Sequence, residues 1–167
     1  LASKVERLEW RSTVTLEPLY DYYGRQSRGA DLILTAAGDQ ASAFSRTRTF
    51  NTSDLVMRAG RPVLVVPTDA DHLDPARILV GWNDSREARR AVADSLPLLR
   101  LASHVAVAEI ITEDRLTEAQ NHVGDVVDWL ALHGIEAEGI AAARSGTDAG
   151  TLARIATEQA ADILVAG

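Results

Sequence analysis

Short apolar runs recur along the chain, separated by segments with helical spacing. Runs without polar interruption indicate strands covered on both faces, because a half-exposed strand would alternate apolar and polar residues. Five clear runs and two weaker ones are present: residues 32–34, 63–66, 78–80, 105–111 and 163–165, and then residues 14–16 and 135–140. These runs predict the strands of a parallel sheet.

Four segments between these runs have apolar residues at the three- and four-residue spacing of an amphipathic helix. They cover residues 53–59, 85–100, 116–133 and 148–160. Asp84 and Glu87 have the spacing of a capping box at the start of the second helix, and Pro97 is expected to kink or shorten its end. Thr147 or Asp148 is expected to cap the fourth helix. Strands that alternate with such helices predict an α/β fold with right-handed crossovers.

The composition is that of a soluble globular protein. The 167 residues are 46% hydrophobic and 25% charged, which is enough to bury a substantial core. A formal net charge of −7 argues against binding to nucleic acid or anionic membranes, because phosphate groups would be repelled. No apolar run is long enough to span a bilayer, and the chain has no cysteine. We therefore expect a cytoplasmic protein without nucleic-acid or membrane partners.

A short sequence pattern occurs twice. The segments GADLIL, residues 29–34, and AADILV, residues 160–165, each begin an apolar run. Their separation is about one domain length, which indicates tandem domains rather than a short solenoid repeat. The Pro- and Asp-rich stretch PTDADHLDPA lies between two of the apolar runs. We therefore expect a first unit over residues 1–67, a linker over residues 68–76 and a second unit over residues 77–167.

The order of these parts resembles the universal stress protein family. The segment ILVGWNDSREARRAVADSLPLL, followed by VAVAEII and GTDAGTLARIATEQAADILVAG, is similar to the first three-quarters of one such domain. Earlier in the chain, GADLIL, SDLVMRAG and RPVLVVP are similar to the closing half of another. The resemblance implies a Rossmann-like parallel-sheet fold in tandem units, with residues 1–67 as the C-terminal half of the first and residues 77–167 as a second that lacks its last part. It also implies an intramolecular pseudo-dimer paired through RPVLVVP, and we expect a homodimer.

The nucleotide-binding branch of this family holds its ligand at the turn after the first strand of a unit. An Asp of that turn reaches the adenosine of ATP, and the resemblance places Asn83, followed by Asp84, there. Ile110 corresponds to the position whose backbone meets the adenine, and Gly167 to the first glycine of the phosphate loop. The resemblance thus implies a site for ATP or AMP that contains these four residues. An alternative interpretation is that Asn83, Asp84 and Ser85 only cap the following helix.

The first unit lacks the glycine pattern of the phosphate loop. Glycines are needed there because they let backbone N–H groups close on phosphate oxygens. Two alignments are possible, and they put these residues at the three glycine positions: Ala36, Asp39 and Thr49, or Gly38, Ala41 and Asn51. At most one glycine is kept, so we expect no ATP binding through this loop. Arg46 and Arg48 also lie in it, and a solvated loop is favoured over an anion site.

We expect a non-enzymatic stress-response module that senses a ligand or binds a partner. One rival hypothesis is a structural or partner-binding module that has lost nucleotide binding, and a weaker one is an ATP-hydrolysing enzyme. For an enzyme the sequence offers no base, nucleophile or metal cluster. The four histidines lack metal-ligand spacing, and His122 is expected at the surface. Glu113, Asp114 and Glu118 are expected to be solvated, and Trp82 is expected to pack, although it could flank a ligand.

Overall fold

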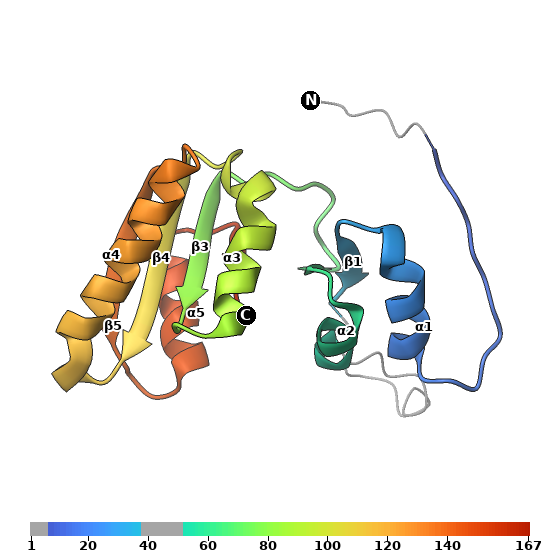
Figure 1. Cartoon of the computed structure of the whole chain (residues 1–167), viewed down its shortest axis with the longest axis horizontal. Helices are drawn as coiled ribbons and strands as arrows, with labels where there is room; N and C mark the ends of the chain where they lie inside the picture. The colour runs from blue at the N-terminus through green and yellow to red at the C-terminus, as the bar shows by residue number, and fades with distance from the viewer. Residues whose placement is uncertain (1–6, 38–51) are drawn as a thin grey trace. The chain divides into compact units, whose positions relative to one another are not determined.

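The computed structural model describes residues 7–37 and 52–167, which form two compact units (Figure 1). The first unit ends at Thr68 and the second begins at Asp69. The division falls inside the Pro- and Asp-rich stretch.

The first unit contains two helices and a small parallel sheet. Its elements are α1 (Leu19–Gln26), the short 3-10 helix η1 (Ser27–Gly29), β1 (Ile33–Ala36), α2 (Thr52–Ala59) and β2 (Val63–Val66). The two strands pair in parallel with Ile33 opposite Val63. Helices α1 and α2 pack together, and Leu55 of α2 is completely buried.

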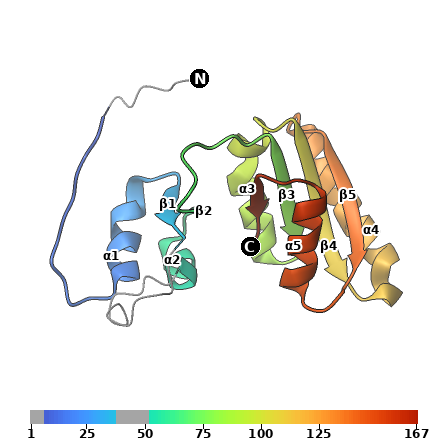
Figure 2. The same cartoon turned by 180° about the vertical axis from the view of Figure 1, so that it is seen from behind.

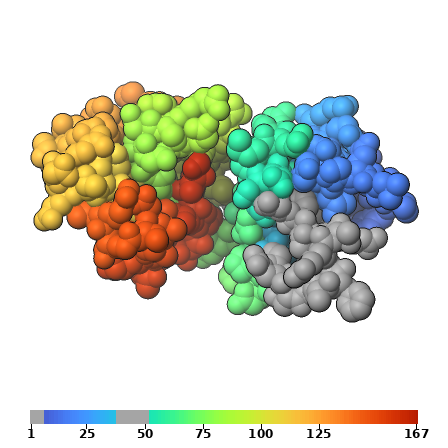
Figure 3. Space-filling view, turned by 90° about the horizontal axis from the view of Figure 1, so that it is seen from below, coloured from blue at the N-terminus to red at the C-terminus, as the bar shows by residue number. Residues whose placement is uncertain are grey.

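The second unit contains a four-stranded sheet with helices on both faces (Figures 1 and 2). Its elements are β3 (Arg77–Trp82), α3 (Arg86–Leu99), β4 (His104–Ile111), the 3-10 helix η2 (Glu113–Arg115), α4 (Leu116–Leu132), β5 (Ala137–Ala143), α5 (Asp148–Glu158) and β6 (Ile163–Val165). All pairings are parallel, in the order β5-β4-β3-β6. Helices α3 and α4 pack on one face, and α5 packs on the other. In the surface view, α5 (orange) lies beside the C-terminal residues (red) (Figure 3).

The strand order creates a topological switch point between β3 and β6. The chain leaves β3 through α3 to β4 and through α4 to β5, always moving away in the same direction. It then crosses back beneath the sheet through α5 and adds β6 on the other side of β3. In open α/β sheets, ligands bind outside the carboxyl ends of the strands at such a point. The loops after β3 and β6 are therefore the places to look for a site.

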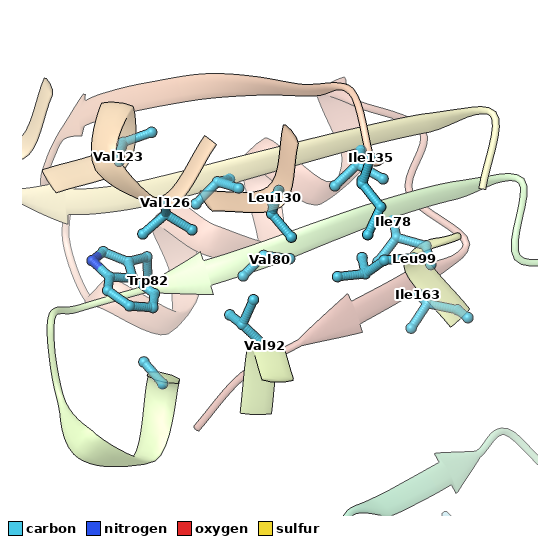
Figure 4. Packing of buried hydrophobic residues seen from close by; sticks show 13 residues of the cluster. Ile78, Val80, Trp82, Val92, Leu99, Val123, Val126, Leu130, Ile135 and Ile163 are labelled. Carbon is cyan, nitrogen blue, oxygen red and sulfur yellow. The ribbon is translucent and has the colours of Figure 1, made fainter. Parts of the chain in front are cut away.

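The main core lies between the sheet and the helices α3 and α4. Figure 4 shows Val80 of β3 between Val92 of α3 and Leu130 of α4, with Trp82 at the carboxyl end of the strand. Val80, Val92 and Leu130 are at most 2% exposed. A smaller cluster on the opposite face packs Leu79 against Ile155 of α5. The central strand is thus buried on both sides, as its continuous apolar run predicts.

A side chain ties the amino ends of β3 and β6 together. The carboxylate of Asp162 accepts a hydrogen bond from the backbone N–H of Arg77 at 2.8 Å, and the N–H of Asp162 donates to the carbonyl of Arg77 at 2.8 Å. The guanidinium Nε of Arg77 also donates to the carbonyl of Gln159 at 2.6 Å. This gives the Asp of the AADILV segment a structural role, because it sets the register of β6 against β3.

The clear apolar runs are confirmed as strands, but two details are wrong. Residues 14–16 form no strand, and Val14 and Leu16 are fully exposed, because no described strand lies beside them to complete the pairing. Strand β5 begins at Ala137, later than predicted, because the turn at Gly134 first places Ile135 in the core. Helix α1 was not predicted, since its sequence LYDYYGRQ has little helical propensity.

The predicted capping box of α3 is also wrong. Ser85, not Asp84, is the N-cap, and its hydroxyl accepts from the N–H of Ala88 at 3.0 Å. Glu87 turns to Arg86 instead, with a guanidinium–carboxylate distance of 2.8 Å. The helix continues through Pro97 to its end at Leu99, so Pro97 does not shorten it appreciably. At α5 the predicted cap Thr147 is confirmed, with its hydroxyl accepting from the N–H of Gly150 at 3.0 Å.

Gly139 in β5 allows α4 to lie close to the sheet, which predicts the result of a substitution. A Cβ at this position would lie 2.7 Å from Cγ1 of Val123, a stiff and buried side chain. Gly139→Ala is therefore expected to lower the free energy of unfolding by about 1–3 kcal/mol in urea denaturation. In a Val123→Ala background the same change should cost at least about 1 kcal/mol less, because the clashing methyl is gone.

Gly124 provides the matched control for this cycle. It lies in α4 beside Val123, but a Cβ there would meet nothing within 4 Å. Gly124→Ala is expected to raise the free energy of unfolding by about 1 kcal/mol, through helix propensity alone. An equal loss of stability for Gly139→Ala with and without the Val123 methyls would contradict the close packing described here.

Candidate functional site

The loop after β3 forms a compact turn that starts α3. The side-chain oxygen of Asn83 accepts from the Ser85 N–H at 3.3 Å and from the Ser85 hydroxyl at 2.6 Å. Ser85 in turn caps the helix through the N–H of Ala88. Asp84 between them has a φ of 52°, in the left-handed region that Asp tolerates better than most residues. The capping interpretation is therefore confirmed for Ser85 alone, and Asn83 supports this cap by accepting from Ser85. No described residue accepts from the Asn83 amide nitrogen.

Asp84 does not cap the helix but forms an ion pair along it. Its carboxylate contacts the guanidinium of Arg89, one turn into α3. Both side chains are about half exposed, at 47% and 56%. The positive φ of Asp84 and its ion pair with Arg89 together direct the carboxylate over the first turn of α3.

Three of the four predicted site residues line one hollow, and the fourth does not. Asn83, Asp84 and Ile110 line a hollow of about 450 Å³ at the carboxyl ends of β3, β4 and β5. Gly167 is not among the lining residues. It lies instead against the first turn of α3, where a Cβ would come within 2.2 Å of the Glu87 carbonyl carbon. Only glycine fits this close approach, which the adjacency of β3 and β6 produces.

The hollow is strongly charged, but its arginines are already paired. The Nε of Arg115 donates to Glu118 at 2.8 Å, and the Nε of Arg144 lies 2.5 Å from the Asp148 carboxylate. The hydrogen bond from Arg115 lowers the pKa of Glu118, so this carboxylate stays ionised. A phosphate group that bound here would compete with carboxylates for both arginines. Glu118, which was expected to be solvated, is indeed exposed, yet it belongs to the rim of the hollow.

A buried carboxylate and a histidine that both line the hollow form a pair that sequence reasoning missed. Glu109 near the end of β4 is only 5% exposed. The Nδ1–H of His122 in α4 donates to both of its oxygens at 3.2 Å, and the His122 Nε2 lies 3.9 Å from Glu118. His122, which was expected at the surface, is partly exposed, and its side chain keeps 29% of its surface accessible. The available signal was the single charge in the apolar run VAVAEII.

Most of the candidate loop in the first unit lies outside the described residues. This applies to Gly38, Asp39, Ala41, Thr49 and Asn51 and to the possible anion-binding residues Arg46 and Arg48, all within residues 38–51. Ala36 is described and ends β1. Within residues 7–37 and 52–167, no three metal-ligating side chains lie close enough to share an ion. No helix in these ranges has the length and apolarity needed to cross a bilayer.

The Glu109–His122 pair predicts a pH dependence. The hydrogen bond to Glu109, with the negative charges of Glu109, Asp84 and Glu118, raises the pKa of His122 above its ordinary value of about 6.5. A raised pKa means that protonated His122 stabilises the fold fully below about pH 6.5, and that this contribution is lost as the pH rises through the raised pKa. In Glu109→Gln, NMR titration of the His122 imidazole should show a lower pKa.

The stability of Glu109→Gln should also depend on pH, in the direction set by the raised pKa of His122. The free energy of unfolding that Glu109→Gln loses is expected to be larger at pH 6 than at pH 9. Glu136→Gln, at an exposed position before β5, is the matched control and should leave the His122 pKa unchanged. A His122 pKa that is the same in both variants would show that the pair does not set the titration.

Comparison with known proteins supports the fold. No protein-family model matches the chain, and no curated protein matches it. Among solved structures, a protein of the universal stress protein family from Burkholderia pseudomallei superposes with a TM-score of 0.51 and 18% identity, covering 56% of this chain and 81% of that one. A universal stress protein from Archaeoglobus fulgidus superposes with a TM-score of 0.68 and 15% identity, covering 89% of this chain. This chain spans 55% of the length of the Archaeoglobus protein. The chain therefore has the Rossmann-like α/β fold of the universal stress proteins, as its resemblance predicted.

Proposed function

We propose that this protein is a non-enzymatic universal stress protein that binds an adenine nucleotide, ATP or AMP, in its second unit. The observation that carries the proposal is the position of Asn83, Asp84 and Ile110. They line one hollow at the carboxyl ends of β3, β4 and β5, on the side of β3 away from β6. Open α/β sheets bind ligands outside the carboxyl ends of their strands. The family resemblance independently assigns the same residues to a nucleotide.

The proposed contacts come from the turn after β3, the end of β4 and the first turn of α3. Asn83 keeps its side-chain oxygen in the turn, so its amide nitrogen is the group that would donate to the ribose or base. Ile110 would contribute its backbone at the end of β4. Gly167 and the first turn of α3 would present backbone atoms, and the positive end of α3 favours an anion. Asp84, which lines the hollow and contacts Arg89, would contact the nucleotide there.

The nucleotide prediction is a measurable affinity for ATP and AMP that depends on Asn83. With nucleotide at ten times its Kd, mass action stabilises the folded state by about 1.4 kcal/mol. For a chain of this size the Tm should then rise by about 3–6 °C. Asn83→Ala should weaken the affinity, measured by isothermal titration calorimetry, by about tenfold, because one ligand hydrogen bond is lost.

Asn121→Ala is the matched control for this measurement. Asn121 is an exposed asparagine of α4 that does not line the hollow. Its removal should leave both the affinity and the ligand-induced Tm rise unchanged. No heat of binding and no Tm shift with either nucleotide at millimolar concentration would overturn the nucleotide proposal.

A second candidate function, a partner-binding module that does not bind nucleotide, is favoured by the ion pairs of the hollow. Arg115 and Arg144 are held by Glu118 and Asp148, so no cation of the hollow is free for a triphosphate without breaking a pair. Asn83 also stands where the nucleotide-binding branch has an aspartate. The calorimetric titration separates the two functions directly, because this candidate predicts no signal.

The absence of catalysis is a prediction of its own. ATP incubated with the protein should stay intact in an anion-exchange assay, because the proposal gives no residue the role of base or nucleophile. Release of AMP or phosphate that Asp84→Ala abolishes would contradict the non-enzymatic proposal. Release that persists in Asp84→Ala would indicate a contaminating activity instead.

The proposal extends to assembly and location. The match to the Archaeoglobus protein covers 89% of this chain and thus reaches into both compact units, which supports a tandem arrangement. On the family resemblance we propose that the two units pair as a pseudo-dimer, that the protein forms homodimers and that it acts in the cytoplasm. Its composition favours neither nucleic acid nor membrane as a partner.

A further inference from the structure

A second cavity lies between α3 and α4, beside the hollow described above. Its volume is about 480 Å³, within the range of about 300–1,000 Å³ of small-molecule sites. Its apolar walls are Trp82 at the end of β3, Val92 of α3, and Val126 and Trp129 of α4. Two indole rings among the lining residues are suited to a flat aromatic guest, because aromatic rings gain from stacked or edge contacts.

The indole nitrogen of Trp82 gives this cavity a polar requirement. Trp82 is only 9% exposed, and its Nε1 is the one buried side-chain nitrogen or oxygen of the described residues that has no hydrogen-bond partner. In Figure 4 this nitrogen lies on the edge of the ring that is turned away from Val80 and Val92. An indole N–H is a donor only, so the missing partner is an acceptor atom. A buried donor without an acceptor costs stability, which a ligand acceptor would remove.

The charges around the cavity specify a second group on the ligand. Asp84 is paired with Arg89, and His122 is paired with Glu109, so each of these side chains has a partner within the protein. Asp125 of α4 also lines the cavity, is exposed and has no hydrogen bond or ion pair with any described residue. The cavity therefore has one uncompensated carboxylate at its edge and indole faces nearby. Both features attract a cation.

We propose that this cavity binds a flat aromatic molecule that carries a hydrogen-bond acceptor in its ring and an ammonium group on a short arm. The ring stacks between Trp82 and Trp129, the ring acceptor receives the N–H of Trp82, and the ammonium group lies at Asp125. This cavity shares Asp84 and His122 with the hollow of the proposed nucleotide site. Its ligand contacts at Trp82, Trp129 and Asp125 are not among the proposed nucleotide contacts. The proposal does not depend on nucleotide binding.

Aminomethylquinoline is the probe that combines the three features. Two matched compounds each lack one of them: aminomethylnaphthalene has no ring acceptor, and methylquinoline has no ammonium group. Binding is read in the proton–nitrogen correlation spectrum, where each tryptophan gives one indole signal. The Trp82 signal should move with the probe, while the signal of Trp10, which is 88% exposed, stays in place. Trp82→Phe and Trp10→Phe assign the two signals by their disappearance.

Two variants test the two polar contacts separately. Trp82→Phe keeps an aromatic ring but removes the N–H, so it should weaken aminomethylquinoline about five- to tenfold and leave aminomethylnaphthalene nearly unchanged. Asp125→Asn removes the charge and should weaken both amines several-fold, with no effect on methylquinoline. Asp128→Asn is the matched control, because Asp128 lies on the same helix, is exposed and does not line the cavity.

The proposal is overturned if the Trp82 signal does not move at millimolar probe, or moves no more than that of Trp10. It is also overturned if Trp82→Phe weakens the two amines equally, since that would indicate lost packing rather than a lost hydrogen bond. Asp125 lies at the surface, so Asp125→Asn is expected to fold normally. This variant still tests the proposal if Trp82→Phe folds poorly. Failure here is distinct from failure of the nucleotide proposal, which is read by ATP calorimetry and Asn83→Ala.

Discussion

The burial of β3 between two parallel neighbours is the constraint on which the rest of the second unit depends. β3 pairs with β4 on one side and β6 on the other, and its side chains enter the cores on both faces of the sheet. The hydrogen bonds between Arg77 and Asp162 fix β6 at its amino end. With both ends of β3 determined, the turn at Asn83 and the close approach of Gly167 to α3 follow as geometric consequences.

The sequence predicted the parts of the fold that depend on local pattern. Continuous apolar runs identified the buried strands, and cap residues such as Thr147 identified helix starts, because both signals lie within a few residues. Features that depend on distant partners were not predictable. Residues 14–16 look like a strand, but a strand needs a neighbour to pair with. The resemblance assigned Asn83, Asp84 and Ile110 to a common site, and they do share one. The pairing of Glu109 with His122 joins two elements, and no sequence spacing reveals it.

The charges at the carboxyl ends of the strands bear on the choice between nucleotide binding and partner binding. Every arginine that lines either hollow is matched by a nearby carboxylate, so the edge is polar without offering an excess of positive charge. An exposed ion pair contributes little stability, so a ligand phosphate could take over an arginine at modest cost. Because a carboxylate balances each of these arginines, the ion pairs alone do not create a strong anion site. A nucleotide would therefore depend more on Asn83, on backbone groups and on the positive end of α3.

Near their carboxyl ends, β3 and β4 carry buried polar groups, unlike the middle of those strands. Trp82 lies directly opposite Glu109 in the parallel register, and both are buried on the face that α4 covers. Elsewhere on this face the two strands carry Ile78, Val80, Val105 and Val107, which need no polar partner. Glu109 obtains one from His122, whereas the donor of Trp82 does not. Two polar groups therefore lie side by side where an apolar pair would pack more easily, and the unsatisfied one is the donor that the proposed ligand would engage.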